Sequence, residues 1–279
     1  MSAPTASTRG TAIPDGYERF VVGRATAVVL RQAAGAVHDA LRAGTLYEYA
    51  AGHPEARQLM GRAPAYAVPL PGGGERVVVR HSLHGGLLAP LTGDRFLPPT
   101  RAPYELTTAL RLSRAGVPTP GVVAYVVYPA GPLLRTADVA TREVVGGRDL
   151  VAVLGGMSDD PLASAAGTAA PKLALVATAR LLRALAAAGA RHPDLNAKNV
   201  LLAPAPTERT NELVAHVLDV DRIVFDRPHS PRVAQANLAR LARSLRKWSD
   251  RLGRELVEDA ILELANGART DTSSRPVHA

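Results

Sequence analysis

Four acidic or amide side chains in the last third of the chain have the types and spacing needed to hold a cation. Asp194 and Asn199 lie five residues apart on a segment that Pro193 punctuates, so we expect a loop whose side chains face one cavity. Asp219 and Asp221 follow about twenty residues later, at the end of a predicted strand. If that strand stays extended, its two-residue period points both carboxylates to the same side. Oxygen-only ligands of this kind suit Mg²⁺, which takes one or two carboxylates plus substrate phosphates.

The same residue types are those that phosphoryl transfer to an alcohol requires. One carboxylate accepts the hydroxyl proton and orients the nucleophile, and an Asp with an Asn holds the metal ions that bridge the phosphates. Asp194 taken alone also suits a turn or a cap, because Asp before Leu-Asn is favourable turn chemistry. The presence of Asn199 and Asp219 favours catalysis, with Asp194 as the base. For Asp221, a second metal contact and a solvated charge at the strand end both stay open.

The elements that must position these residues fall into two unlike halves. Runs of β-branched residues predict strands at residues 63–70, 75–81, 122–128, 137–145, 200–202 and 214–220. Helical spacing of apolar residues predicts helices at residues 25–44, 103–115, 172–188, 231–253 and 254–264. The Gly-rich turn Pro71–Gly74 is interpreted as a hairpin loop rather than a phosphate-binding loop. Because strands dominate the first half and helices the second, we predict an α+β protein with two lobes.

Composition bounds the possible functions. A chain of 279 residues that is 47% apolar can bury a sizeable core, and the absence of Cys excludes disulfides, thiolate zinc sites and cysteine nucleophiles. The formal net charge of +8 indicates an anionic partner, which composition leaves open between nucleic acid, a phosphorylated substrate and a membrane surface. The sequence shows neither a run of about 20 apolar residues nor a secretory signal, so we expect a cytoplasmic protein.

Several motifs resemble those of a known enzyme family. The order His192, Asp194, Leu195, Asn199 and then hydrophobic residues resembles the catalytic loop of protein kinases. The fuller sequence HPDLNAKNVLL, with LDVDR after it, resembles the lipopolysaccharide kinases of Gram-negative bacteria, most of all those acting on 3-deoxy-D-manno-octulosonic acid (Kdo). Three further segments share the resemblance, at residues 80–97, 105–120 and 237–247.

The resemblance implies a protein-kinase-like α+β fold with ATP between a strand-rich N-lobe and a mainly helical C-lobe. We expect a disordered tail at residues 1–13 and a nucleotide-covering N-lobe at residues 14–145. We expect the C-lobe, with the catalytic loop, metal site and acceptor site, at residues 146–265, and a second disordered tail at residues 266–279.

Carried over residue by residue, the resemblance implies that Asp194 is the catalytic base and that Asn199 and Asp219 bind Mg²⁺. It also implies the residues that bind ATP. Arg80 takes the position of the kinase phosphate-binding Lys, with Glu105 as its partner, and Gly61 lies in a reduced phosphate-covering loop. Glu143 and Val145 lie in a hinge that holds adenine by backbone groups.

The sequence departs from the general kinase pattern at several points. Arg80 replaces the usual Lys, although Arg keeps the charge and forks onto phosphate oxygens. Asp221 stands where the DFG motif has its Gly, which argues against an ordinary activation-loop switch, and there is no G-x-G-x-x-G loop. His192 is predicted to support the loop, while His81 and His84 receive no role.

The implied activity is ATP- and Mg²⁺-dependent phosphorylation of a Kdo hydroxyl in the lipid A–inner core of lipopolysaccharide, which makes the protein a phosphotransferase with an alcohol acceptor. Its partners would be ATP and a Kdo-containing lipid A precursor, at the cytoplasmic face of the inner membrane. The alternatives are another acceptor (a core heptose, a small alcohol or a protein) and a non-catalytic, nucleotide-binding pseudokinase. Nucleic acid is not expected, because the chain shows no aromatic platform or recognised nucleic-acid motif.

The positive charges divide between two expected tasks. Arg80 and Lys198 are predicted to face ATP phosphates. Helix 237–247 carries further cations, and its Leu spacing predicts a packed C-lobe helix rather than a membrane-surface or nucleic-acid helix. Those cations, predicted to meet solvent, an acidic sugar, a phosphorylated lipid or an anionic membrane, are Arg240, Arg243, Arg246 and Lys247.

Overall fold

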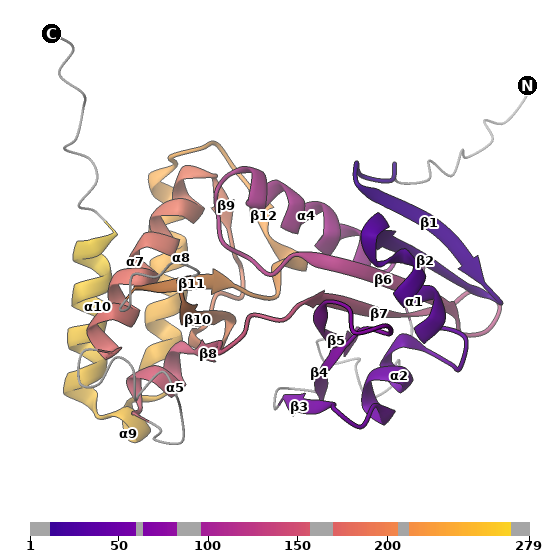
Figure 1. Ribbon diagram of the computed structural model, residues 1–279. Coiled ribbons are helices and arrows are strands. Elements are labelled where there is room, and N and C mark those ends of the chain that lie inside the picture. The colour runs from indigo at the N-terminus through magenta and orange to yellow at the C-terminus, as the bar shows by residue number, and fades with distance from the viewer. Residues whose placement is uncertain (1–11, 60–63, 83–95, 157–169, 206–211, 269–279) are drawn as a thin grey trace, which may run out of the picture. The chain divides into compact units, whose positions relative to one another are not determined.

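The computed structural model of the chain describes residues 12–59, 64–82, 96–156, 170–205 and 212–268 (Figure 1). They form two compact units. The first contains the described residues up to Thr107 together with Val122–Glu143, and the second contains Thr108–Gly121 together with the described residues from Val144 onwards. The division expected from the sequence at residue 145 differs from this one mainly in Thr108–Gly121, which the expected N-lobe included.

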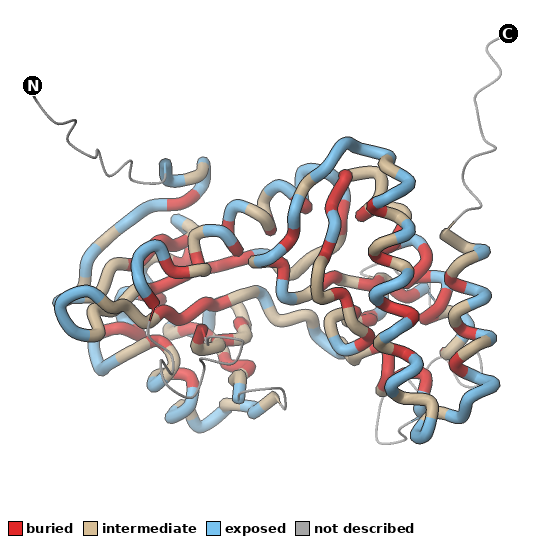
Figure 2. The backbone as a smooth tube through the Cα atoms, turned by 180° about the vertical axis from the view of Figure 1, so that it is seen from behind, coloured by how far each residue is buried: buried red, intermediate tan, exposed pale blue. Residues whose placement is uncertain are grey.

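An antiparallel sheet is the framework of the first unit. Within the described residues, its seven strands are hydrogen-bonded in the order β1-β2-β6-β7-β5-β4-β3. They are β1 (Tyr17–Val22), β2 (Ala25–Leu30), β3 (Arg57–Leu59), β4 (Ala65–Pro69), β5 (Arg76–His81), β6 (Val122–Pro129) and β7 (Arg135–Arg142). Buried residues, red in Figure 2, concentrate in the inner strands of this sheet. The Gly-rich turn is the predicted hairpin loop between β4 and β5, with Gly72 and Gly73 at positive φ.

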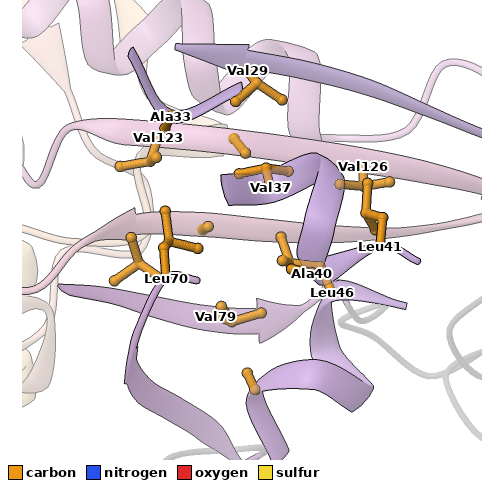
Figure 3. Close-up of a cluster of buried hydrophobic side chains, with 14 of the residues drawn as sticks. Val29, Ala33, Val37, Ala40, Leu41, Leu46, Leu70, Val79, Val123 and Val126 are labelled. Carbon is orange, nitrogen blue, oxygen red and sulfur yellow. The ribbon is translucent and has the colours of Figure 1, made fainter. Parts of the chain in front are cut away.

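Short helices cover one face of this sheet. These helices are η1 (Arg31–Ala33), α1 (Ala34–Ala40) and α2 (Leu46–Gly52). The first part of α4 (Ala102–Arg114) lies on the other face, where Leu106 is near Val28 and Tyr125. Figure 3 shows Val37 of α1 among side chains of the strands, including Val29 and Val126, and all three are fully buried. Each such aliphatic side chain contributes about 1.5–3 kcal/mol by leaving water. The core of this unit is thus built mainly from aliphatic residues.

The helix predicted over residues 25–44 is wrong for its first six residues. Ala25–Leu30 form β2, which pairs with β1 along one edge and with β6 along the other. Val28 and Val29 are β-branched and almost completely buried. Hydrogen bonding along both edges and burial outweigh the helical tendency of the neighbouring alanines. The α-helix begins only at Ala34.

The second unit is mainly helical. Its α-helices are the remainder of α4, α5 (Leu150–Leu154), α7 (Ala170–Ala187), α8 (Pro231–Arg246), α9 (Ser249–Leu252) and α10 (Arg254–Gly267). Its short strands are β8 (Arg148–Asp149), β9 (Ala190–Arg191), β10 (Val200–Pro204), β11 (Leu213–Val217) and β12 (Val224–Phe225). Helices α7, α8 and α10 pack against one another (Figure 1). The predicted α+β class, with strands followed by helices, is confirmed.

The end of α10 differs from the expected tail. The helix continues through Gly267, and a Cβ at this residue would lie 2.8 Å from the Cβ of Ala179 in α7. Only Gly therefore allows this close approach of the two helices without a shift. Of the predicted tails at residues 1–13 and 266–279, residues 1–11 and 269–279 lie outside the described residues. No helix in the described part of the chain has both the length and the apolarity needed to cross a membrane.

Candidate active site

The predicted catalytic loop is anchored by His192, which follows β9. Its imidazole is 1% exposed, with Nε2 3.0 Å from the Leu218 carbonyl oxygen and Nδ1 accepting the Asp194 N–H at 3.2 Å. Because burial disfavours the cation, the pKa of His192 is lowered, although the bond to the Leu218 carbonyl acts in the opposite direction. This geometry agrees with the predicted supporting role, since a neutral His192 ties the loop to the segment that carries Asp219.

Two Asn side chains hold the rest of the loop. Asn196 accepts the N–H groups of Lys198 and Asn199 at 2.9 and 3.1 Å, which starts the short turn η3 (Ala197–Asn199). The side-chain amides of Asn196 and Asn199 both donate to the main-chain oxygen of Asp194, at 3.1 and 3.2 Å. Because its nitrogen is committed to that bond, Asn199 is left with its amide oxygen as a ligand atom.

Asp219 lies beside Asn199 because of strand pairing. β10 and β11 are antiparallel, with Val200 opposite Val217, and the Leu218 N–H donates to the Asn199 carbonyl at 2.9 Å. The strand then ends, because Asp219 adopts a left-handed conformation with φ 58° and ψ 48°. Within the described residues, its exposed carboxylate has no hydrogen bond or ion pair.

The expected placement of Asp221 is wrong. The strand was predicted to run to residue 220, but β11 ends at Val217 and Asp221 lies in the 3-10 turn η4 (Val220–Arg222). The two-residue period therefore does not apply, and the pairing of Asp219 with Asp221 on one strand face is lost. Asn199 is instead linked to the Asp219 segment through its hydrogen bond with Leu218.

The donor set fits Mg²⁺. Asn199 presents an amide oxygen and Asp219 a carboxylate, both of which are hard oxygen ligands. The described residues contain no group of three or more His, Cys, Asp or Glu side chains suited to a metal ion. One carboxylate and one amide match a Mg²⁺ site that substrate phosphates and water complete, rather than an all-protein cage.

Asp194 has a partner that we did not predict. The Arg222 guanidinium lies with one terminal nitrogen 2.6 Å from Asp194 Oδ2, and the side chains are 52% and 42% exposed. The signal in the sequence was the Arg at the end of the LDVDR motif, to which we assigned no function. Only the turn after Asp219 brings Arg222 back to the catalytic loop.

Helix α8 supports the loop through polar residues that we also did not predict. Asn237 is fully buried, accepts the His192 N–H at 2.9 Å and donates to the Ala190 carbonyl at 2.9 Å. The Ser244 hydroxyl accepts the Ala197 N–H at 3.0 Å. The sequence did contain a signal for this role. Asn237 precedes Leu241 by four residues, which places a polar side chain on the buried face of the helix.

Replacing Asn237 with Ala is expected to lower the free energy of unfolding by about 2–4 kcal/mol. The change leaves a buried N–H and a buried carbonyl without partners and opens a small cavity. Urea denaturation followed by circular dichroism measures it. Gln235→Ala, an amide on the exposed side of the same helix, is the control and should change stability by less than about 0.5 kcal/mol. Equal effects of the two variants would contradict the supporting role of Asn237.

In the first unit, Arg80 and Glu105 form the ion pair that the resemblance implies. Arg80 in β5 lies 2.5 Å from Glu105 in the first turn of α4, and the Glu105 side chain is only 7% exposed. A buried carboxylate needs such a partner, because desolvation would otherwise destabilise its charge. The pair is therefore present, and its contact with ATP phosphates stays a prediction.

The predicted hinge residues have separate environments. The Glu143 carboxylate binds Arg57 at 2.6 Å and Arg76 at 2.7 Å, and its N–H donates to the Arg76 carbonyl at 3.0 Å. The N–H and the side chain of Glu143 are therefore already bonded. A backbone hydrogen bond from Glu143 to adenine would have to use the Glu143 carbonyl. Val145 is 73% exposed, beyond the end of β7 at residue 142. Gly61 lies outside the described residues.

The remaining basic and histidine residues named in the sequence analysis either contact other side chains of this chain or are exposed. The Lys198 ammonium lies 5.3 Å from the centre of the Trp248 ring in a cation–π contact, and its expected contact with ATP stays a prediction. His81 Nδ1 is 2.6 Å from Asp138, while His84 lies outside the described residues. On α8, Leu241 and Leu245 are buried while the cations are exposed, which confirms a packed helix; those exposed cations are Arg240, Arg243, Arg246 and Lys247.

Stability should fall in mild acid because of two histidines. Burial lowers the pKa of His192 and of His216 below the usual 6.5, so the unfolded chain binds protons that the native chain does not. The free energy of unfolding should then fall below about pH 6.5, by up to about 1.4 kcal/mol per pH unit for each histidine. Urea midpoints between pH 7.5 and 5 measure this. His216→Gln should reduce the slope, and an unchanged slope would contradict its contribution.

Comparison with known proteins identifies a family that the chain matches. The sequence model of the lipopolysaccharide kinase (Kdo/WaaP) family matches residues 73–259. A 3-deoxy-D-manno-octulosonic acid kinase of Stenotrophomonas maltophilia is 33% identical over 71% of this chain and 71% of its own length. Kinases of the same name from Actinobacillus succinogenes and Haemophilus influenzae are 30% and 29% identical, over 70% and 69% of this chain and 75% of each relative. A solved structure described as WaaP in complex with acyl carrier protein has a TM-score of 0.42 and 19% identity, over 82% of this chain and 92% of that chain.

The matched range covers more than half of the chain and includes every segment that carries the motifs above except Gly61. It contains the Arg80–Glu105 pair of the strand-rich unit and the catalytic loop of the helical unit. The chain is therefore an enzyme of the kinase class with an α+β fold, and it belongs to the lipopolysaccharide kinase (Kdo/WaaP) family.

Proposed function

We propose that the protein transfers the γ-phosphate of ATP to a hydroxyl of Kdo in the lipid A–inner core of lipopolysaccharide. The observation that carries this proposal is that hydrogen bonds join Asp194 to Asn199, and Asn199 to Leu218, the residue before Asp219. The relatives named above as Kdo kinases support Kdo rather than another sugar as the acceptor.

Each residue has one task in the proposed reaction. Asp194 accepts the proton of the acceptor hydroxyl and orients its oxygen. Asn199 and Asp219 hold Mg²⁺, which when bound offsets the negative charge of the phosphates. Arg80, positioned by Glu105, binds the α- and β-phosphates of ATP. In such a reaction, positioning and electrostatics would supply most of the rate.

The acceptor implies a place at the membrane. A Kdo-containing lipid A precursor carries acyl chains, so the enzyme would work peripherally at the cytoplasmic face of the inner membrane. The exposed cations of α8, among them Arg240 and Arg243, would attract an anionic surface. This attraction to the membrane is electrostatic, so binding to an anionic surface would weaken as the salt concentration rises.

The proposal is tested with the purified full chain, γ-labelled ATP and Mg²⁺. Kdo-lipid A precursor should gain one phosphate, located on Kdo by mass spectrometry after mild acid hydrolysis. If a heptose-containing core, a small alcohol or a protein is labelled and Kdo is not, the acceptor is that molecule and the proposal of Kdo is wrong. Mg²⁺-dependent ATP binding without any transfer would identify a pseudokinase and overturn the proposal.

A further inference from the structure

Arg222 lies beside the proposed catalytic base Asp194, and most N–H donors of its guanidinium have no partner within the described residues. One terminal nitrogen lies 2.6 Å from Asp194 Oδ2, and the side chain is 52% exposed. Within the described residues, this is its one hydrogen bond or ion pair. A guanidinium has five N–H donors in a planar fork, so the edge that does not touch Asp194 is open to another ligand.

The backbone that carries Arg222 is tied to the catalytic loop. Leu218 donates its N–H to the Asn199 carbonyl and has its own carbonyl bound by His192. Asp219 then turns the chain, and the Ile223 N–H bonds to the Val220 carbonyl to close the 3-10 turn. Main-chain hydrogen bonds therefore hold the backbone of Arg222 near the loop that carries Asp194.

A purely stabilising ion pair explains this arrangement poorly. Half-exposed pairs contribute little to stability, because water and salt screen them. A guanidinium bound to the catalytic carboxylate also competes with the acceptor hydroxyl for the same oxygens. An Arg at this place therefore hinders the base unless its charge acts on the substrate.

We propose that Arg222 binds the carboxylate of an acidic sugar acceptor and so selects acidic over neutral sugars. This inference rests on the proposed function, in which the acceptor is a sugar acid. In a sugar acid, one ring carries both the carboxylate and the hydroxyl groups. If Arg222 holds that carboxylate while it contacts Asp194, a hydroxyl of the same sugar is brought close to Asp194. Arg suits this task because its parallel N–H groups bind a carboxylate in a bidentate manner.

The test measures the discrimination between two acceptors, Kdo-lipid A precursor and the same molecule with the Kdo carboxylate converted to its methyl ester. The wild type should prefer the acid in kcat/KM by about 10- to 100-fold, the usual loss when a charged hydrogen bond is removed. Arg222→Gln should bring this preference to about one, and Arg222→Lys should keep part of it because the charge remains without the fork. The KM for ATP should stay within about twofold.

The ratio separates recognition from effects on the base. Any change that acts through Asp194 alters both acceptors equally and cancels in the ratio. Arg227→Gln, an exposed arginine a few residues later, is the matched control and should keep the wild-type preference. An unchanged preference in Arg222→Gln, or in Arg222→Lys if the Gln variant does not fold, overturns the inference. A wild type that phosphorylates neither acceptor instead overturns the proposed function.

Discussion

Replacement of Asp194 by Asn is expected to lower kcat by about 10²- to 10⁴-fold, the range that a positioned general base contributes. Asn has nearly the same shape but does not accept a proton. The loop should keep its conformation, because the hydrogen bonds of residue 194 to His192, Asn196 and Asn199 use its main-chain atoms. The measurement is phosphate transfer to Kdo-lipid A precursor under single-turnover conditions, which isolates the chemical step.

Nucleotide binding separates loss of catalysis from loss of structure in this variant. The affinity for a fluorescent ATP analogue with Mg²⁺ should stay within about twofold, since Asp194 is not among the proposed nucleotide or metal ligands. Asp250→Asn, an exposed Asp on α9, is the control for an unspecific loss of one negative charge and should keep full activity. Turnover by Asp194→Asn at the wild-type rate would show that Asp194 is only a turn residue.

Replacement of Asp219 by Asn is expected to lower activity by about 10²- to 10³-fold and to raise the Mg²⁺ concentration for half-maximal activity. Metal ions contribute several kcal/mol by stabilising charge in the transition state, and each 1.36 kcal/mol corresponds to a factor of ten. Asn is the informative choice because it tolerates the left-handed backbone at φ 58°, whereas Ala would add strain. The variant thus removes the charge and keeps the turn.

Binding of Mn²⁺ in the presence of an ATP analogue gives a readout independent of turnover. Electron paramagnetic resonance should show weaker Mn²⁺ binding in Asp219→Asn than in the wild type, because one anionic ligand is lost. Asp226→Asn is the matched control: the Asp226 side chain accepts the Arg227 N–H, a bond that Asn can also make. If Asp219→Asn binds Mn²⁺ and depends on Mg²⁺ as the wild type does, the metal lies elsewhere.

Local sequence patterns were sufficient for the parts of the site that are themselves local. Asp194, Asn196 and Asn199 interact within six residues, so the turn chemistry of the loop is visible in the chain itself. The hairpin of β4 and β5 likewise follows from β-branched runs around a Gly-rich turn. Together with the family motifs, these patterns predicted the α+β class, the kinase family and the Arg80–Glu105 pair.

Contacts between distant residues were decided by tertiary structure. Residues 25–30 become a strand because β1 and β6 bond to both edges, and no pattern within those six residues contains that information. Asn237 lies 45 residues from the His192 N–H that it binds, and Arg222 lies 28 residues from Asp194. The buried Asn is stable only because its partners are buried with it, and Arg222 reaches the base only because Asp219 reverses the chain. Periodicity and motif spacing describe neighbours along the chain, whereas these side chains depend on hydrogen bonds that form only when the fold closes.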